Sequence, residues 1–488
     1  MSAQLPVLPP GSSSILSGLS ETFSFHSSPE SFITSRVLAF RRSHPSLADS
    51  RTPIRAKVLN RNVAVISSYD HVRTLLCDED VIMNLSSSKA YDELMAPFFP
   101  PPNLLLLDPP EHGPRKAQWL ESMAELPDRI SKGVRSRTLS HFENIRSGSS
   151  IDLYDSMKFL SWDLILGIFL GNLEDPQRAK DLVNQVEKLQ EDLLRGQFSL
   201  FPVSVNTRFW QSPRSKGLAA RKKLQEVLKS HVGVQSTGCP FVTSSLSDKE
   251  DVANHLLLFT SSLAAKALAS LLTALMMNLF VSCARNDGRS ELLSDMVLST
   301  RGRGDQNKLI ESIVLETERL SPPVVGIMRQ TTADVILSGG SEQSPDIRIP
   351  GGWDAWLYFV GASRDPAVFG DTAASFVPHR YLQESGERTE GFAFGAGPKT
   401  CLGRDLMRQI AMTVAKTCLG LADEETNVEH STPIKLNCPG DSIPEGVRGW
   451  LGWQADVKPE VWARDMKQLP TQRPTKPLMV TLTHDLSP

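Results

Sequence analysis

The segment FAFGAGPKTCLGRDLMRQIA, residues 392–411, is the most informative part of this 488-residue chain. It contains the spaced pattern F-x-x-G-x-x-x-C-x-G, formed by Phe394, Gly397, Cys401 and Gly403. Glycines let a loop approach a flat group closely because they lack a side chain. Helical periodicity begins just after the cysteine, so Cys401 is expected near a helix N-terminus, where the peptide dipoles favour a thiolate. The pattern therefore predicts a thiolate that binds iron.

Two nucleotide-binding motifs and a structural role are the alternatives for this segment. Residues 395–397 read Gly-Ala-Gly, but Thr400 stands where a dinucleotide loop has its third glycine. Residues 398–400 read Pro-Lys-Thr, but the glycine that a phosphate loop has before its lysine is missing. A buried structural role is the default for a single cysteine. None of the three accounts for the whole pattern, which favours the metal-bound thiolate.

The overall composition is that of an ordinary globular protein. Apolar residues make up 40% and charged residues 22%, and the net charge of -3 gives no sign of nucleic-acid binding. The six cysteines include no C-x-x-C pair, which argues against a disulfide framework or a zinc site. The N-terminus lacks the basic and apolar regions of a secretory signal. We therefore expect a cytoplasmic monomer, which can also lie peripherally on membranes.

Residues 256–284 form an internal stretch long and apolar enough to span a bilayer. Lys266 lies near its middle, where a charge in lipid costs about 3 kcal/mol. A long helix buried inside a large helical protein is therefore favoured over a transmembrane anchor. In that setting Lys266 would reach a polar cavity or pair with an acid on a neighbouring helix.

Helical periodicity dominates the chain, so the sequence predicts a mainly α fold with a small β region. Helices are expected at 70–77, 113–124, 126–146, 151–170, 175–195, 214–232, 249–284, 306–320 and 401–421. Strands are expected within a hairpin at 55–67 and at 332–337, 346–350, 355–362 and 477–486. Because the small sheet is segregated by sequence, we expect one domain over residues 21–488, preceded by a flexible segment at 1–20.

Charged residues elsewhere in the chain are placed where they could support the cysteine loop. Glu316 and Arg319 are three residues apart on a predicted helix, so they share a face and can pair. Residues 376–381 read Phe-Val-Pro-His-Arg-Tyr and place Arg380 before the cysteine segment. An E-x-x-R pair alone is common on protein surfaces. The combination with the cysteine pattern is more specific.

Together these segments resemble the cytochrome P450 family. Glu316 and Arg319 fit the family's E-x-x-R motif, and residues 376–381 fit its aromatic-Pro-Arg segment. The resemblance implies that Arg380 completes a buried network with this pair, which supports the cysteine loop from behind. Such a network is costly when one member is lost. The matched segments run from about residue 108 to residue 411, and they imply one mainly helical haem-thiolate fold.

The resemblance also implies a non-covalently bound haem b, an iron protoporphyrin IX, with Cys401 as the metal ligand. Phe394, Gly397 and Gly403 would be cofactor-binding residues of the same loop. Four cationic or titratable residues are implied to bind haem propionates; they are His112, Lys116, Arg329 and Lys399. The family more often has arginine at the position of Lys116, and arginine or histidine at that of Lys399. Lysine still binds a carboxylate, although as a point charge rather than a fork.

The long apolar stretch departs from the family. The usual acid–alcohol pair, which feeds protons to the reaction above the haem, is replaced here by Leu263 and Ala264. Thr260 lies one helical turn before Ala264 and would share its face, so Thr260 or Ser261 could hold a water that relays protons. Alternatively the enzyme needs no relay, because its substrate is a hydroperoxide, or the substrate itself delivers the proton. A tightly packed core with a shifted alignment is the structural alternative.

The leading functional hypothesis is a monooxygenase that oxidises a hydrophobic small molecule in specialised metabolite biosynthesis, with electrons from a flavoprotein reductase. The apolar loop 96–107 is the expected pocket wall. Lys399, Arg404 and Arg408 are either a docking patch for the reductase or ordinary solvated charge. One alternative is a hydroperoxide-rearranging isomerase or dehydratase that needs no reductase. Another is a non-enzymatic haem sensor or carrier.

Overall fold

The computed structural model describes most of the chain. The described residues are 15–43, 52–58, 61–87, 89–99, 102–171, 176–199, 204–232, 249–281, 292–339, 346–382, 388–421, 434–438 and 443–484. They form two compact units, which are interleaved along the sequence. Unit 1 comprises Met1–Ser86, Thr138–Ser156 and Ser270–Pro488, and unit 2 comprises Ser87–Arg137 and Met157–Ala269. The prediction of one domain over residues 21–488 stays a prediction.

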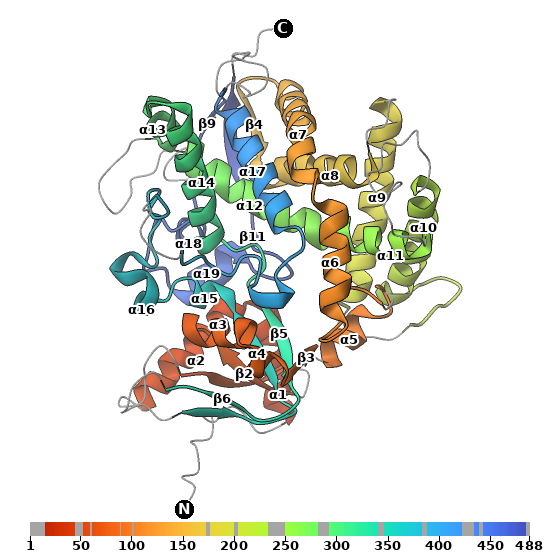
Figure 1. Ribbon diagram of the computed structural model, residues 1–488, viewed down its shortest axis with the longest axis vertical. Helices are drawn as coiled ribbons and strands as arrows, with labels where there is room; N and C mark the ends of the chain where they lie inside the picture. Colours follow the sequence, from red (N-terminus) through yellow and green to blue (C-terminus); the bar gives the residue numbers. More distant parts are fainter. Residues whose placement is uncertain are drawn as a thin grey trace, which may run out of the picture. The chain divides into compact units, whose positions relative to one another are not determined.

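The prediction of a mainly α fold with a small β region is confirmed (Figure 1). The helices are α1 (Ile15–Ser27), α2 (Pro29–Ser43), α3 (Tyr69–Cys77), α4 (Glu79–Ile82), α5 (Lys89–Met95), α6 (His112–Met123), α7 (Leu126–Glu143), α8 (Leu153–Leu170), α9 (Pro176–Gln197), α10 (Pro213–His231), α11 (Lys249–Phe259), α12 (Ser262–Phe280), α13 (Leu293–Ser299), α14 (Arg303–Leu320), α15 (Phe359–Ala362), α16 (Pro366–Phe369), α17 (Arg404–Cys418), α18 (Glu445–Trp450) and α19 (Pro459–Asp465). Short 3-10 turns lie at Gly370–Thr372 and Gly397–Lys399.

The strands are short. They are β1 (Ile54–Val58), β2 (Arg61–Ile66), β3 (Leu85–Ser87), β4 (Ser149–Asp152), β5 (Gly326–Thr331), β6 (Val335–Leu337), β7 (Ile347–Ile349), β8 (Asp354–Tyr358), β9 (Lys435–Asn437), β10 (Met466–Lys467), β11 (Arg473–Pro474) and β12 (Met479–Thr483). The predicted hairpin is β1 and β2, which pair antiparallel. The strand predicted at 355–362 is wrong in its second half, because residues 359–362 turn into α15.

The largest sheet, with strand order β1-β2-β8-β5-β3, is buried on both faces. Side chains alternate between the faces of a strand. Val63 and Val65 of β2 therefore join Trp356 and Tyr358 of β8 in an apolar cluster with α1 and α2. The neighbouring side chains on the same strands join the opposite cluster, which contains α3 and Phe392. The sheet thus anchors the segment that leads into Cys401.

In unit 1, α14 lies beside α17 (Figure 1). Helix α14 is buried over nearly all of Leu309–Leu320, including the charged residues Glu316, Glu318 and Arg319. A buried charge is stable only when it is paired and hydrogen-bonded. The partners of those charges therefore organise the region around α14.

In unit 2, α9 and α10 form a helical hairpin that packs closely at two glycines. A Cβ on Gly196 would lie 2.9 Å from the Cα of Gly217, so any larger residue would push the helices apart. Residues 204–211 of their connection are exposed and form a turn, in which the Thr207 amide donates to the Trp210 carbonyl at 2.8 Å. Figure 1 shows this connection running out beyond the ends of the two helices.

The predicted helix at 249–284 is broken in the structure. Its described part forms α11 and α12, and the break falls at Thr260 and Ser261. Serine and threonine compete for backbone groups through their hydroxyls. The Thr260 hydroxyl donates to the Leu256 carbonyl at 2.7 Å, and the Ser261 hydroxyl accepts from the Ala264 amide at 3.3 Å. Ser261 therefore caps the start of α12.

The segment Lys249–Phe280 is the candidate membrane span among the described residues, judged by length and composition. In the structure, 78% of its apolar window is buried, as in the core helix of a large protein. Within the N-terminal segment that was predicted to be flexible, residues 15–20 belong to helix α1, and residues 1–14 lie outside the described part.

Candidate functional site

The cysteine loop is held by its own backbone in unit 1. The Cys401 amide donates to the Phe394 carbonyl at 2.8 Å, and the Gly395 amide donates to the Phe392 carbonyl at 2.9 Å. Cys401 is exposed and lies three residues before the first residue of α17. The loop therefore presents the Cys401 thiol beside a helix N-terminus, as the sequence predicts, where the peptide dipoles stabilise a negative charge.

Gly397 is required by the loop for two separate reasons. Its φ of +64° lies in the left-handed region, which side chains other than glycine adopt at a cost. A Cβ at this position would also overlap the carbonyl oxygen of Leu76 at the end of α3. Gly403 is different, because a Cβ there would lie 3.9 Å from the Cys401 Sγ, at ordinary contact distance. The loop is thus fixed against α3 while the sulfur stays accessible.

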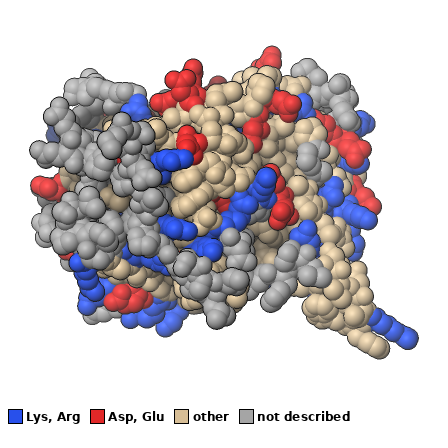
Figure 2. Space-filling view, turned by 90° about the horizontal axis from the view of Figure 1, so that it is seen from below, with Lys and Arg blue, Asp and Glu red and all other residues tan. Residues whose placement is uncertain are grey.

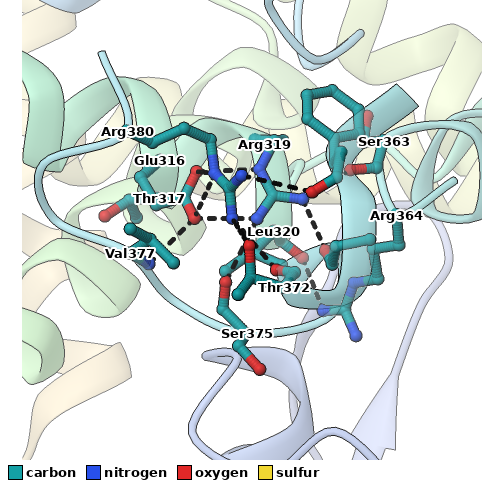
Figure 3. Close-up of polar contacts among 12 residues, drawn as sticks. Glu316, Thr317, Arg319, Leu320, Ser363, Arg364, Thr372, Ser375, Val377 and Arg380 are labelled. Atoms are coloured by element: carbon teal, nitrogen blue, oxygen red, sulfur yellow. Dashed lines mark hydrogen bonds and ion pairs between the residues drawn. The ribbon is translucent and has the colours of Figure 1, made fainter. Parts of the chain in front are cut away.

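The structure brings Glu316, Arg319 and Arg380 together (Figure 3). Arg319 donates to both carboxylate oxygens of Glu316 at 2.7 Å, and both side chains are fully buried. Arg380 donates from Nε to the same two oxygens at 3.1 Å. The Val377 amide donates to Glu316 at 2.9 Å. One carboxylate therefore compensates two guanidinium groups and a backbone amide.

The remaining donors of the two arginines bind backbone carbonyls of the loops around them. Arg319 donates to Ser363 at 2.7 Å and to Ala373 at 2.6 Å, and Arg380 donates to Thr372 at 3.0 Å. Both guanidinium groups lie over the ring of Phe369, at 4.7 Å for Arg319. The network therefore joins α14 to the segment 363–380 that precedes the cysteine loop.

A second ion-pair cluster, around the buried Glu318, links α14 to α17, and it was not predicted from the sequence. Arg408 donates to both oxygens of Glu318, at 2.7 Å for the shortest bond, and to Glu390 at 2.7 Å. Arg408 is therefore engaged in ion pairs rather than solvated. It no longer counts toward the predicted docking patch for the reductase. A signal was present, because Glu318 lies next to Arg319, which was expected in a buried network, and a buried carboxylate requires a partner.

The expected propionate-binding residues lie in both units. In unit 1, Lys399 ends the 3-10 turn two residues before Cys401, and Arg329 lies in β5 opposite Ala355 of β8. In unit 2, His112 is buried at the first position of α6, and Lys116 is half-buried one turn later on the same face. Their roles stay predictions.

The segment before α6 is anchored by Asp108. Its carboxylate accepts from the Ser87 amide at 2.7 Å and from the Ser87 hydroxyl at 3.1 Å. Helix α6 is held against α11 by an ion pair between Arg115 and Asp251 and by the Trp119 ring, which lies 4.7 Å from that of His255. The position of His112 therefore follows from contacts at both ends of the helix.

At the start of α12, the predicted catalytic residues surround the helix break. Thr260 and Ser261 are buried, whereas Leu263 and Ala264 are half-buried. Lys266 pairs with Glu191 of α9 at 2.8 Å, and Ser262 donates to the same carboxylate at 2.8 Å. The pairing of Lys266 with an acid on a neighbouring helix is confirmed. Within the described part of unit 2, this ion pair gives Lys266 a structural role.

The apolar loop 96–107 packs differently at its two ends. Phe98 and Phe99 are buried, and the Phe98 ring lies under the Arg214 guanidinium of α10 at 5.7 Å. Asn103 organises the turn by donating to the Phe99 carbonyl at 2.7 Å. Residues 105–107 are half-buried. The phenylalanines therefore belong to the core of unit 2, and only the leucines at the end of the loop remain as candidates for a pocket wall.

Comparisons with known proteins agree with this site. A sequence model of the family described as "Cytochrome P450" matches residues 305–421, which contain both ion-pair networks and the cysteine loop. Over these residues the chain is similar to the cytochrome P450 family. The segment that matches includes the helices α14 and α17.

Curated relatives match this chain over part of their length. It is 29% identical to echinocystic acid 23-monooxygenase of Saponaria officinalis over 30% of this chain and 28% of that protein. It is 24% identical to cytochrome P450 26A1 of Danio rerio over 54% of this chain and 57% of that protein. The chain therefore covers about a quarter to a little over half of these relatives.

Solved structures show the same fold. The retinoic acid-bound cyanobacterial CYP120A1 superimposes with a TM-score of 0.65 over 91% of this chain and 93% of that chain, at 16% identity. Cytochrome P450EX alpha (CYP152N1) with myristic acid gives a TM-score of 0.62 over 95% of this chain and 97% of that chain, at 15% identity. At these identities the likeness concerns the fold.

The residues of unit 1 fit the haem that similarity to the cytochrome P450 family implies. The donor set contains one accessible thiol, held beside a helix N-terminus by a backbone that uses Gly397 for close packing. Lys399 and Arg329 supply the positive charges that carboxylates bind. A thiolate ligand with cationic neighbours suits an iron porphyrin that carries propionates.

Proposed function

We propose that this protein is a haem-thiolate monooxygenase that oxidises a hydrophobic small molecule. The observation that carries the proposal is the Cys401 loop, in which an accessible thiol is fixed by the Phe394 carbonyl and by the following helix. In this proposal Cys401 is the iron ligand, and Phe394, Gly397 and Gly403 shape the loop around it. His112, Lys116, Arg329 and Lys399 bind the propionates.

When bound, the haem supplies the activation of dioxygen. The reaction takes one dioxygen, two electrons and two protons for each substrate, inserts one oxygen atom into a C–H bond and releases the other as water. The electrons require a reductase, for which a flavoprotein is proposed. The protons must be delivered by this chain or by the substrate, because a positioned proton transfer contributes about 10²–10⁴ in rate.

The hydroxyls at the helix break are the proposed proton path. The proton of the Thr260 hydroxyl is donated to Leu256, so its oxygen can still accept. The Ser261 oxygen accepts from Ala264, so its proton can still be donated. The pair offers one acceptor and one donor on adjacent residues, which are the groups that a bound water needs as partners. Ala264, one turn after Thr260, adds no bulk beside this water.

The proposed substrate is apolar because the half-buried surface at the start of α12 is apolar. Leu263, Ala264 and Ala267 are half-buried there, and the charge of the half-buried Lys266 is paired with Glu191. A surface of this kind binds hydrophobic molecules. The name of the relative from Saponaria officinalis specifies oxidation of echinocystic acid, which supports a role in specialised metabolism. The retinoic acid in the cyanobacterial structure also supports an apolar substrate class.

A carbon-monoxide difference spectrum tests the ligand, and turnover tests the reaction. We expect a red-shifted Soret band that depends on Cys401, and an oxygenated product from apolar substrates when NADPH and a flavoprotein reductase are supplied. Absence of the red-shifted band in haem-loaded protein would overturn the assignment of Cys401 as the iron ligand. Substrate conversion that proceeds equally well without reductant would overturn the proposal that the protein is a monooxygenase.

The second candidate is a hydroperoxide-rearranging isomerase or dehydratase. It is favoured by Leu263 and Ala264, which replace the acid–alcohol pair that the family uses for protons. Such a reaction needs no external electrons, because the O–O bond is already reduced. Turnover of a fatty-acid hydroperoxide without reductase, together with no reductase-dependent turnover, would select this candidate. A haem sensor or carrier is the third, and it predicts ligand-induced spectral changes without any product.

The reductase is proposed on the need for electrons rather than on a basic patch. Arg408 is engaged with Glu318 and Glu390, and Arg404 pairs with Asp405 at 2.9 Å. On the face drawn in Figure 2, acidic and basic side chains are both present among uncharged residues. Binding that weakens with salt in a titration against a flavoprotein would support an electrostatic interface.

We propose a cytoplasmic monomer that binds membranes peripherally through the α9–α10 connection. Phe209 and Trp210 at its tip are 93% and 57% exposed, and Arg208 beside them is exposed. Exposed aromatics flanked by cations suit the interface of an anionic bilayer. Co-sedimentation with anionic vesicles that is lost in a Phe209→Ser/Trp210→Ser variant would support this. Equal sedimentation of the variant would overturn it.

A further inference from the structure

Arg408 of α17 lies among two carboxylates and an aromatic ring. Its guanidinium donates to Glu318 of α14 at 2.7 Å and to Glu390 at 2.7 Å. Its Cζ lies 5.7 Å from the centre of the Phe394 ring. A planar guanidinium can do all of this at once, whereas an ammonium group cannot. Arg408 therefore joins α14, α17 and the segment in front of the cysteine.

The ring that Arg408 covers belongs to the residue that holds the cysteine. The Phe394 carbonyl accepts the Cys401 amide at 2.8 Å. The same segment is held at its start, where the Tyr69 hydroxyl donates to the Glu390 carbonyl at 3.0 Å and the Phe392 amide donates to the Ser363 hydroxyl at 3.2 Å. Between Glu390 and Cys401, Arg408 is thus the side chain that links both ends of the segment to α17.

We propose that Arg408, clamped by Glu318 and Glu390, is a positioning residue that holds Phe394 and thereby sets the placement of the Cys401 thiolate. The inference rests on the proposed ligation of haem by Cys401. Arg408 acts through the ring and carbonyl of Phe394, so it is not a catalytic residue. The positioning is distinct from the Glu316–Arg319–Arg380 network, which binds the loops at 363–380 instead.

The clamp depends on pH through Glu318. Burial raises the pKa of Glu318 to about 7, Arg408 and Arg404 of α17 oppose this increase, and Glu390 adds to it. Above this pKa the ionised carboxylate binds Arg408 by charge-assisted bonds, which are about twice as strong as neutral ones. Below it the neutral carboxyl of Glu318 holds Arg408 less firmly. Placement of the thiolate should therefore loosen as the pH falls.

The test measures how fast the carbon-monoxide complex loses its red-shifted thiolate band, on both sides of pH 7. We expect the loss in the unmodified protein to become faster as the pH falls through the pKa of Glu318. In Arg408→Gln it should be faster at every pH, by about two- to five-fold for a lost cation–π contact. In Glu318→Gln the pH step near 7 should disappear, because the group that titrates is gone.

A milder variant and a matched control separate positioning from general destabilisation. Glu390 is half-exposed, so Glu390→Gln should fold, and the pH step should move lower because Glu390 helps to raise the pKa of Glu318. Arg36→Gln is the matched control, because the Arg36 side chain is 25% exposed and that of Arg408 is 22% exposed. Arg36 also pairs with a nearly buried carboxylate, Glu21, and lies over an aromatic ring, that of Phe32. Arg36→Gln should lower the free energy of unfolding without changing the rate at which the red-shifted band is lost.

The outcomes are distinct. A missing red-shifted band in the unmodified protein would overturn the proposed ligation itself. With that band present, an unchanged rate in Arg408→Gln, or an unchanged pH step in both Glu318→Gln and Glu390→Gln, would overturn the positioning role. An equal acceleration in Arg36→Gln would also overturn it, because the effect would then follow stability alone.

Discussion

Glu316 and Arg319 face each other across one turn of α14, joined by two hydrogen bonds of 2.7 Å, with both side chains fully buried. The pair is not isolated, since Arg380 and the Val377 amide share the same carboxylate. Glu316 is therefore the residue whose loss leaves the most charge unbalanced.

Glu316→Ala should lower the free energy of unfolding by about 3–5 kcal/mol, because it leaves the buried Arg319 and the partly buried Arg380 without their shared counter-charge. Chemical denaturation measures this. Glu311→Ala is the control on the same helix, because its pair with Arg388 is exposed and should be worth less than about 1 kcal/mol. Similar losses in the two variants would show that the buried network contributes no more than a surface pair.

Cys401→Ser should abolish the red-shifted carbon-monoxide band, because a serine hydroxyl does not ionise near neutral pH. Cys438→Ser, at a half-buried position in unit 1, should retain the band in full. The two spectra, compared at equal haem content, decide whether Cys401 is the iron ligand. A surviving band in Cys401→Ser would mean that another residue is the ligand.

Gly397→Ala should destabilise the protein and weaken haem retention. The left-handed φ alone costs about 1–2 kcal/mol for a residue with a Cβ, and the overlap with the Leu76 carbonyl adds to this. Gly352→Ala is a close control, because Gly352 has a φ of +83° and no atom within 4 Å of its Cβ position. Equal unfolding energies for the two variants would show that contact with α3 is unimportant.

Thr260→Val should reduce product formation per electron consumed, by up to about 10²-fold if this hydroxyl positions the proton-relaying water. Valine keeps the shape of threonine and removes only the hydroxyl. Thr417→Val in α17 is the matched control, because it removes a hydroxyl of the same kind, which donates to the Thr413 carbonyl at 2.7 Å. Unchanged coupling in Thr260→Val would remove this residue from the proton path.

The raised pKa of Glu318 also predicts how stability changes with pH. The folded state retains this proton up to about pH 7, whereas the unfolded chain releases it near 4.5. Its contribution to the free energy of unfolding should therefore be largest below about pH 4.5 and be lost as the pH rises through about 7. The difference between the unmodified protein and Glu318→Gln isolates this slope. A difference that does not vary over that range would contradict the raised pKa.

Much of the site could be predicted from the sequence where neighbours along the chain make it. The Cys401 loop and the start of α17 depend on glycines and helix periodicity within ten residues. Glu316 and Arg319 meet because residues three apart share a helix face. The mainly α fold was predictable for the same reason, since periodicity is a local property.

Contacts between distant segments were decided by the tertiary structure. Arg408 is an ordinary helix cation in sequence, and only the packing of α14 against α17 turns it into a buried partner of Glu318. The helix break at Thr260 and Ser261 lies within a long, mostly apolar stretch, and periodicity alone does not report that their hydroxyls take backbone partners. The sequence by itself thus determined that Cys401 is presented by a glycine-rich loop before a helix. Only the tertiary structure decided which charges hold that loop, since a buried charge takes whichever partner the fold brings near.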